Sequence, residues 1–125
     1  MIFASLIYIN ILMDLLLEGN QMEKFDYINQ LLPFYIELLT KKQQEVMTLY
    51  YYDNYSLSEI AQQLEISRNG VYDSLKKSEE FIEKYESLLH LSTNCNKRMH
   101  YYTLLQSLEN KQVNDIVKEL IDLED

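Results

Sequence analysis

An all-α fold is predicted by three features of this sequence. The chain of 125 residues contains only two Gly and one Pro, so tight turns between strands are scarce. Leu and Glu, both good helix formers, are the most frequent residues. Apolar residues recur at spacings of three and four along most of the chain, which is the period of an amphipathic helix. We expect a three-helix bundle containing a helix-turn-helix motif over residues 56–77, with a long second motif helix and a C-terminal helical subdomain over 97–124.

The first element of the motif starts at Ser56. In Ser56-Leu57-Ser58-Glu59 the Ser56 hydroxyl accepts from the amide three residues on, while the Glu59 side chain reaches back to the Ser56 amide. This capping box predicts a short helix, whose face carries Ile60, Ala61 and Leu64. The pattern breaks at Glu65, where such turns often carry Gly.

A second helix is predicted to start at Ser67, another N-cap candidate. Val71 and Leu75 share a face with Ile66, so two helices and a tight turn can close on one small core. In one alternative, the two helices form a corner with a structural role only. In the functional alternative the second helix projects its first turns outward into a DNA major groove.

Six residues are the candidate nucleic-acid contacts. Arg68 would read guanine and Asn69 adenine, with Tyr72 adding an apolar or hydroxyl contact. Backbone phosphates would be held by Ser67, Lys76 and Lys77.

Residues 1–21 form an apolar N-terminal extension that the fold does not need. A signal peptide is disfavoured because the first basic residue is Lys24, and a membrane span because the run is short and contains Asp14. The codons of Glu18-Gly19 can spell a ribosome-binding sequence just before Met22. We therefore expect that Met22 is the native start and that residues 22–125 form a single all-α domain.

Two helical stretches precede the motif. Phe25, Ile28, Leu32, Tyr35 and Leu39 are spaced by three and four, and Pro33 lies inside this run, where the helix either kinks or restarts. Thr40 with Gln43 predicts a second capping box, opening a helix that runs through Tyr51 and ends at Asp53-Asn54.

The apolar face of the second motif helix continues beyond the motif. Its apolar positions run from Val71 to Leu89, and this apolar seam makes the helix longer than a recognition helix needs to be. Its face must pack against the C-terminal helices or against a second copy of the chain, as a homodimer. Ser92 to Asn96 is predicted to be a polar break. Two helices follow, and the second opens near Asn110 or Asn114.

Charge and composition narrow the function classes. The net charge of −9 repels nucleic-acid backbones, and residues 40–86 carry six Lys and Arg against nine Asp and Glu. The single Cys95 is expected to be an inert thiol in a reducing, cytoplasmic setting. His90 and His100 do not fit a metal spacing, and two isolated Gly cannot form a phosphate loop. We expect no enzyme activity, no cofactor and no membrane association.

The stretch from Leu39 to Glu86 contains four distinctive pieces: Leu39-Thr40 with Gln43, Tyr50-Tyr51, Tyr55 to Leu57 with Glu59 to Ala61, and Ser67-Arg68 with Val71 to Asp73. On these pieces the chain resembles the bacterial YlxM family, described as helix-turn-helix proteins of Gram-positive bacteria and mollicutes. The resemblance extends from about Met22 to the C-terminus. Glu65 in the turn and Gly70 in the second helix depart from the usual pattern. The motif also looks like the promoter-reading C-terminal domain of sigma factors.

The resemblance implies a sigma-like helix bundle and a role connected with the signal recognition particle pathway. The leading hypothesis is a DNA-binding regulator. The alternative is a protein–protein interaction module that uses the motif as a scaffold and binds protein or RNA of the signal recognition particle.

Overall fold

The computed structural model describes residues 21–124, and its secondary structure there is helical throughout, without strands. The predicted all-α class is confirmed. The extension and the start at Met22 concern residues 1–21, of which 1–20 lie outside the described part. The contacts divide the described chain at Ile82 into two units, residues 21–82 and 83–124. The single domain over 22–125 stays a prediction.

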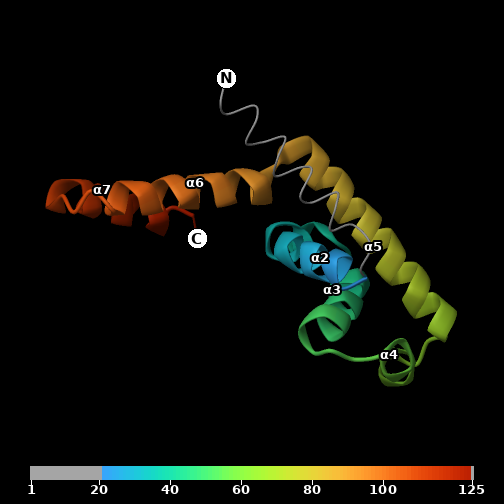
Figure 1. Ribbon diagram of the computed structural model, residues 1–125. Coiled ribbons are helices and arrows are strands. Elements are labelled where there is room, and N and C mark those ends of the chain that lie inside the picture. The colour runs from blue at the N-terminus through green and yellow to red at the C-terminus, as the bar shows by residue number, and fades with distance from the viewer. Residues whose placement is uncertain (1–20, 125) are drawn as a thin grey trace. The chain divides into compact units, whose positions relative to one another are not determined.

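The first unit starts with α2 (Gln21–Tyr35), which continues as a short 3₁₀ helix, Ile36–Leu38 (Figure 1). Pro33 is exposed inside α2, and the α-helix ends two residues after it. α2 contributes much of the core of the unit, because four of its apolar side chains are at most 1% exposed. These are Ile28, Leu31, Leu32 and Tyr35.

α3 (Lys41–Met47) begins with the predicted capping box, in which Thr40 Oγ1 accepts from the Gln43 amide at 3.2 Å. The helix does not run on as a regular α-helix to Tyr51. It widens into a π-helix, Thr48–Tyr52, whose Asp53 amide bonds to the Thr48 carbonyl five residues back. Leu49 and Tyr51 are buried in this wider turn.

The motif follows as α4 (Leu57–Leu64) and α5 (Arg68–Leu89). The predicted length of α5 is confirmed. Val71, Leu75, Ser78 and Ile82 of its seam are buried and belong to the first unit. The part of the seam through Ile82 is therefore covered within the chain and cannot serve a second copy. Leu89 at its end is 48% exposed.

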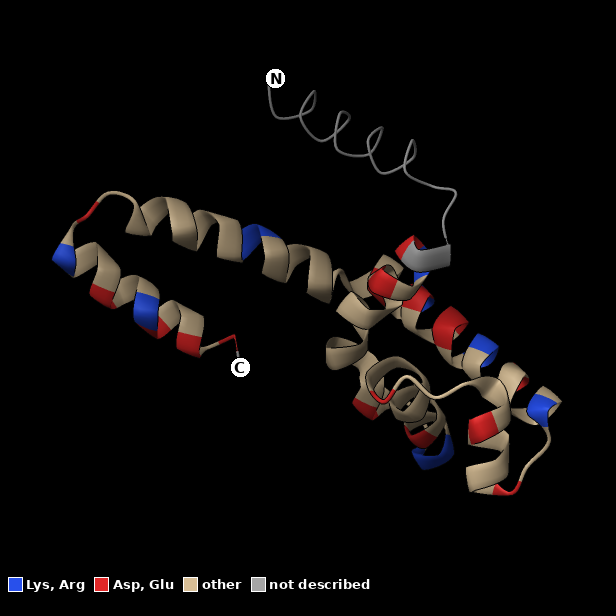
Figure 2. Ribbon diagram, turned by 60° about the horizontal axis from the view of Figure 1, so that its bottom comes forward, with Lys and Arg blue, Asp and Glu red and all other residues tan. Residues whose placement is uncertain are grey.

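The second unit contains the end of α5, then α6 (Leu91–Gln106) and α7 (Lys111–Asp122), which lie antiparallel side by side (Figures 1 and 2). The predicted break at Ser92 to Asn96 is wrong, because these residues form the first turns of α6. The chain turns instead at His90, in the left-handed conformation (φ 55°). Asn110 caps α7 as predicted, accepting from the Val113 amide at 3.1 Å.

The missed helix start is explained by Glu86. Its buried carboxylate accepts from the amides of Ser92 at 2.9 Å and Thr93 at 3.1 Å, and from the Thr93 hydroxyl at 2.8 Å. These amides belong to the first turn of α6, where the helix itself supplies no acceptor. A residue on the preceding helix thus caps α6, so its polar first turn is compatible with a helix.

Candidate nucleic-acid interface

The turn between α4 and α5 is built around Glu65. The Ser56–Glu59 capping box starts α4, with Ser56 Oγ accepting from the Glu59 amide at 3.1 Å and Glu59 Oε1 accepting from the Ser56 amide at 3.2 Å. Glu65 then ends α4 in the left-handed conformation (φ 55°, ψ 42°). The amides of Glu65 and Ile66 both bond to the Ala61 carbonyl. The turn therefore forms with Glu in the conformation that Gly adopts at lowest cost.

Ser67 fixes the start of α5. Its hydroxyl oxygen accepts from the Gly70 amide at 2.9 Å, which confirms the predicted N-cap. A Cβ on Gly70 would lie 3.1 Å from this oxygen, so the absence of a side chain leaves room for the cap. The cap uses an acceptor lone pair of the hydroxyl oxygen, so it is compatible with donation of the hydroxyl proton to a phosphate, the contact predicted for Ser67.

The tip of α5 is exposed. Arg68 and Asn69 occupy the first two helical positions, and Tyr72, one turn later, is 51% exposed. All three side chains are therefore accessible to a ligand. An exposed guanidinium and an exposed amide are the groups that pair bidentately with guanine and adenine edges.

The outward face of α5 has mixed charge. Lys76 and Lys77 are exposed, but Asp73 lies three and four residues before them and four after Asn69, so it shares their face. Figure 2 shows red and blue segments alternating along this helix. Phosphate attraction is consequently weaker here than on a purely basic recognition helix.

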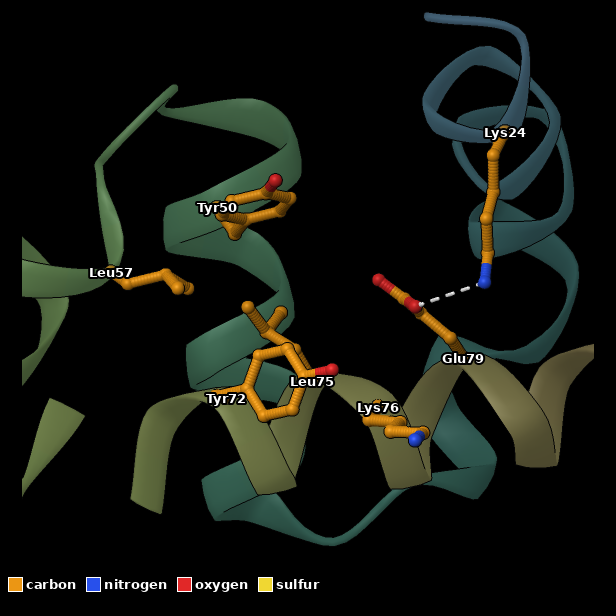
Figure 3. A pocket seen from close by; sticks show the side chains of 7 residues that line it. All are labelled: Lys24, Tyr50, Leu57, Tyr72, Leu75, Lys76 and Glu79. Atoms are coloured by element: carbon orange, nitrogen blue, oxygen red, sulfur yellow. Dashed lines mark ion pairs between the residues drawn. The ribbon is translucent and has the colours of Figure 1, made fainter. Parts of the chain in front are cut away.

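A cavity of about 210 Å³ lies beside this face (Figure 3). Tyr72 and Lys76 line it, whereas Ser67, Arg68, Asn69 and Lys77 do not. The six predicted residues therefore fall into three groups. Ser67, Arg68 and Asn69 lie at the start of α5, Tyr72 and Lys76 line the cavity, and Lys77 is exposed outside it. The other residues that line the cavity are Lys24, Tyr50, Leu57, Leu75 and Glu79.

Glu79 is held from two sides at the cavity. Its Oε2 lies 3.7 Å from Lys24 Nζ, and its Oε1 accepts from the Tyr51 hydroxyl at 2.6 Å. The dashed line in Figure 3 marks the ion pair with Lys24. These bonds link α5 to α2 and to the π-helix within the first unit.

An aromatic cluster supports the same wall. The ring centroid of Phe25 is 4.8 Å from that of Tyr51 in a stacked arrangement and 5.9 Å from that of Tyr50 in an edge arrangement. Tyr50 and Tyr51 are themselves 5.0 Å apart. Lys24, Tyr50 and Glu79 were missed as site residues because they come from three segments. Of these residues, only Tyr50 stood out in the sequence, as part of the Tyr50-Tyr51 pair, and that pair did not predict a cavity.

No helix in the described part of the chain combines the length and the apolarity that spanning a bilayer requires.

Comparison with known proteins places these features in a family. Residues 22–122 match the UPF0122 family, described as "Putative helix-turn-helix protein, YlxM / p13 like". A UPF0122 protein of Geobacillus sp. (strain WCH70) is 46% identical over 109 residues, which cover 82% of this chain and 99% of the relative. A UPF0122 protein of Pediococcus pentosaceus is 44% identical over 92 residues, covering 74% and 81%. One from Listeria monocytogenes is 40% identical over 104 residues, covering 78% and 94%.

Proposed function

Because the chain belongs to the UPF0122 family of YlxM/p13-like helix-turn-helix proteins, we propose that it is a cytoplasmic regulatory protein that binds DNA through α5. The observation that carries this proposal is the exposed, capped start of α5, with Arg68, Asn69 and Tyr72 accessible. A recognition helix enters the major groove with its N-terminal residues, and these are the residues at that end.

Each exposed group has a distinct role in the proposal. Arg68 pairs with the O6 and N7 atoms of guanine and Asn69 with the N6 and N7 atoms of adenine. Tyr72 contacts a base edge or a thymine methyl group. Lys76 and Lys77 bind phosphates, and Ser67 donates its hydroxyl proton to one.

The acids near the tip favour specific over nonspecific binding. Asp73 lies among the phosphate-binding residues, and Glu65 ends the preceding turn. The net charge of −9 opposes the approach of DNA, so base contacts are expected to supply a larger share of the affinity than in a basic protein, while the phosphate contacts of Lys76 and Lys77 keep the binding dependent on salt.

Selection of duplexes from a random library, followed by fluorescence anisotropy at several salt concentrations, tests the proposal. Arg68→Ala is expected to weaken binding of the selected site by about 1–3 kcal/mol and to relax the preference at one base position. Lys77→Ala is expected to weaken all sequences alike and to lower the salt slope by about one unit. Equal binding of all sequences by the parent and by Arg68→Ala would remove the reading role of the tip.

Asp73→Asn provides the opposite change at the same face. Removal of a carboxylate between Asn69 and the two lysines is expected to raise DNA affinity and to steepen the salt dependence. Glu80→Gln, on the same helix, is the charge-matched control further from the tip. A larger gain from Glu80→Gln than from Asp73→Asn would place the DNA on a later part of the helix.

A second candidate function is favoured by the negative charge. In it the motif is a scaffold, and the chain binds protein or RNA components of the signal recognition particle, as the family resemblance implies. Binding to protein through apolar contacts is expected to persist at high salt, whereas DNA binding through phosphates weakens steeply. A partner whose binding is insensitive both to salt and to Arg68→Ala would favour this second function.

A further inference from the structure

The C-terminal hairpin, defined as α6 and α7 with their connecting turn, exposes more apolar surface than a solvated pair of helices requires. Ten of the large apolar residues in the second unit are more than one third exposed, against two that are buried, Tyr102 and Val117. Two of the ten, Leu88 and Leu89, end α5, and the other eight belong to the hairpin: Leu91, Met99, Tyr101, Leu104, Leu105, Leu108, Ile116 and Leu123. An excess of this kind marks an interaction surface.

The exposed residues of α6 form an ordered stripe. Tyr101, Leu104, Leu105 and Leu108 follow the spacing i, i+3, i+4 and i+7, and they are 52%, 51%, 38% and 64% exposed. This is the apolar face of an amphipathic helix. It differs from the face directed at α7, which carries the buried Tyr102.

α7 carries a matching stripe. Ile116 and Leu123 are seven residues apart and 61% and 82% exposed, whereas Val117, on the side of α6, is 1% exposed. Each helix of the hairpin therefore has one apolar side against its neighbour and a second apolar side that the second unit itself does not cover.

The charges of α6 support burial of its outer side. In its 16 residues only Lys97 and Arg98 are charged, and Arg98 pairs with Glu124 at the inner side. Figure 2 shows α6 tan over nearly its whole length, with a single blue stretch, while α7 alternates between blue and red. A helix that faces water on its outer side would be expected to carry several charges there.

We propose that a second copy of this chain covers these stripes, so that two hairpins form a four-helix bundle. The stripes of α6 and α7 belong to one hairpin, and a two-fold axis brings the same stripes from two copies together and closes the assembly. A standard interface buries roughly 800 Å² on each partner, of which about 500 Å² is apolar, and the six stripe residues supply this apolar area if each loses about 85 Å². The proposal does not depend on nucleic-acid binding.

Sedimentation velocity of the full chain between about 1 and 100 μM tests the proposal. A dimer is expected for the parent. Leu104→Glu is expected to weaken it by at least about 100-fold, because symmetry places two unpaired carboxylates in one apolar interface. A parent that is monomeric across this range would overturn the proposal.

Leu38→Glu provides the matched control, since Leu38 lies in the first unit and is 54% exposed, against 51% for Leu104. The control is expected to leave the dimer intact. Loss of the dimer in Leu38→Glu but not in Leu104→Glu would place the interface in the first unit and overturn the proposal. Leu104→Gln, measured with the helix content by circular dichroism, provides an uncharged variant: a folded Leu104→Gln chain that dimerises as tightly as the parent would also overturn it.

Discussion

The two units of this chain are stabilised in different ways. The unit of residues 21–82 buries thirteen apolar side chains, most of them from α2, α3, the π-helix, α4 and α5, whereas the unit of residues 83–124 buries two. The second unit is instead held by polar contacts at its two ends, the Glu86 cap and the Arg98–Glu124 pair. A helix-turn-helix unit with its own core can present a rigid reading surface, while a hairpin of this kind needs a further apolar partner.

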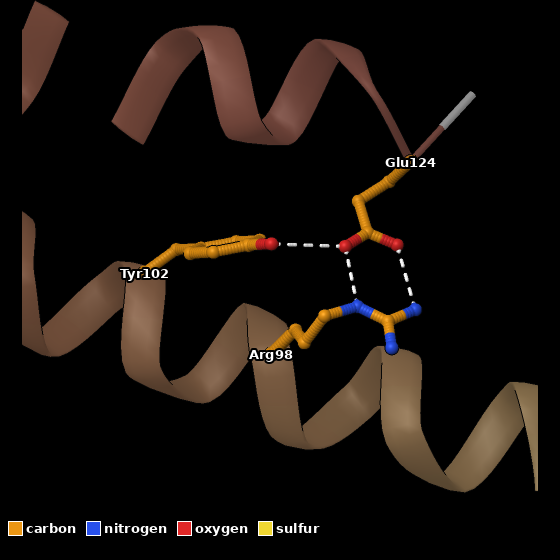
Figure 4. A network of polar contacts seen from close by, with 3 residues as sticks. All are labelled: Arg98, Tyr102 and Glu124. Carbon is orange, nitrogen blue, oxygen red and sulfur yellow. Dashed lines mark hydrogen bonds and ion pairs between the residues drawn. The ribbon is translucent and has the colours of Figure 1, made fainter. Parts of the chain in front are cut away.

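The polar contact at the open end of the hairpin is drawn in Figure 4. Arg98 Nε and Nη2 donate to the two carboxylate oxygens of Glu124 at 2.6 and 2.9 Å, and the Tyr102 hydroxyl donates to the same group at 3.0 Å. These bonds, that of Arg98 first, lower the pKa of Glu124 to about 2. Burial and the nearby Glu124 raise the pKa of the Cys95 thiol, which agrees with the inert thiol expected from the sequence.

The largest effect is expected in the core of the first unit. Leu32→Ala removes a side chain with 0% exposure and is expected to lower the free energy of unfolding by about 2–5 kcal/mol, through lost burial and the cavity left behind. Urea unfolding followed by circular dichroism measures the change. Leu38→Ala, at an exposed site in the same unit, is expected to stay within about 0.5 kcal/mol. If Val117→Ala lowered the free energy of unfolding as much as Leu32→Ala, the second unit would also be stabilised by an apolar core, and the contrast between the two units would be wrong.

The second largest loss of stability is expected from removal of the Glu86 cap. Glu86→Ala leaves the amides of Ser92 and Thr93 without their acceptor and is expected to cost about 1–3 kcal/mol. Hydrogen exchange at these two amides is expected to accelerate more than exchange in the first unit. Glu80→Ala, an exposed glutamate on the same helix, is the control and should change neither rate. Unchanged exchange in Glu86→Ala would show that the start of α6 does not depend on this carboxylate.

A smaller effect is expected from the pair at the other end of the hairpin. The folded-state pKa of Glu124 lies below its ordinary value of 4.5, so the stabilisation is fully present above pH 4.5 and is lost as the pH falls through about 2. Acid titration of the parent, followed by hydrogen exchange in α7, should show this loss. Glu124→Gln should remove it, while the first unit responds alike in both chains. An identical acid response of α7 in the two chains would exclude Glu124 as its cause.

The smallest change concerns the turn of the motif. Glu65→Gly replaces a non-Gly residue in the left-handed conformation and is expected to raise the stability of the first unit by up to about 1 kcal/mol, because the strain relieved exceeds the added chain entropy. Glu65→Ala removes the same charge but keeps the strain. Equal stability of the Gly and Ala variants in thermal unfolding would assign the effect to charge rather than to backbone conformation.

The sequence indicated those elements whose signals are local. Capping boxes at Thr40 and Ser56, the N-cap at Ser67 and the apolar seam of α5 are each contained within a few consecutive turns, and all are present in the structure. The start of α6 was missed because its cap, Glu86, lies on the preceding helix. The π-turn at Thr48–Tyr52 was missed because a sequence pattern of three and four does not distinguish it from an α-helix.

By itself the sequence determined the helical class, the helix-turn-helix motif and the residues at the tip of α5, since these follow from caps and periodicity. Only the tertiary structure decided that α2 and the π-helix bring Lys24 and Tyr50 beside Tyr72 and Glu79 of α5, because packing between distant segments leaves no local signal. Only the tertiary structure likewise showed that the apolar face of α5 is buried through Ile82, whereas the outer stripes of α6 and α7 are exposed. An apolar stripe reads the same in sequence whether the chain buries it or leaves it to a partner, and the burial of each side chain in the folded chain distinguishes the two.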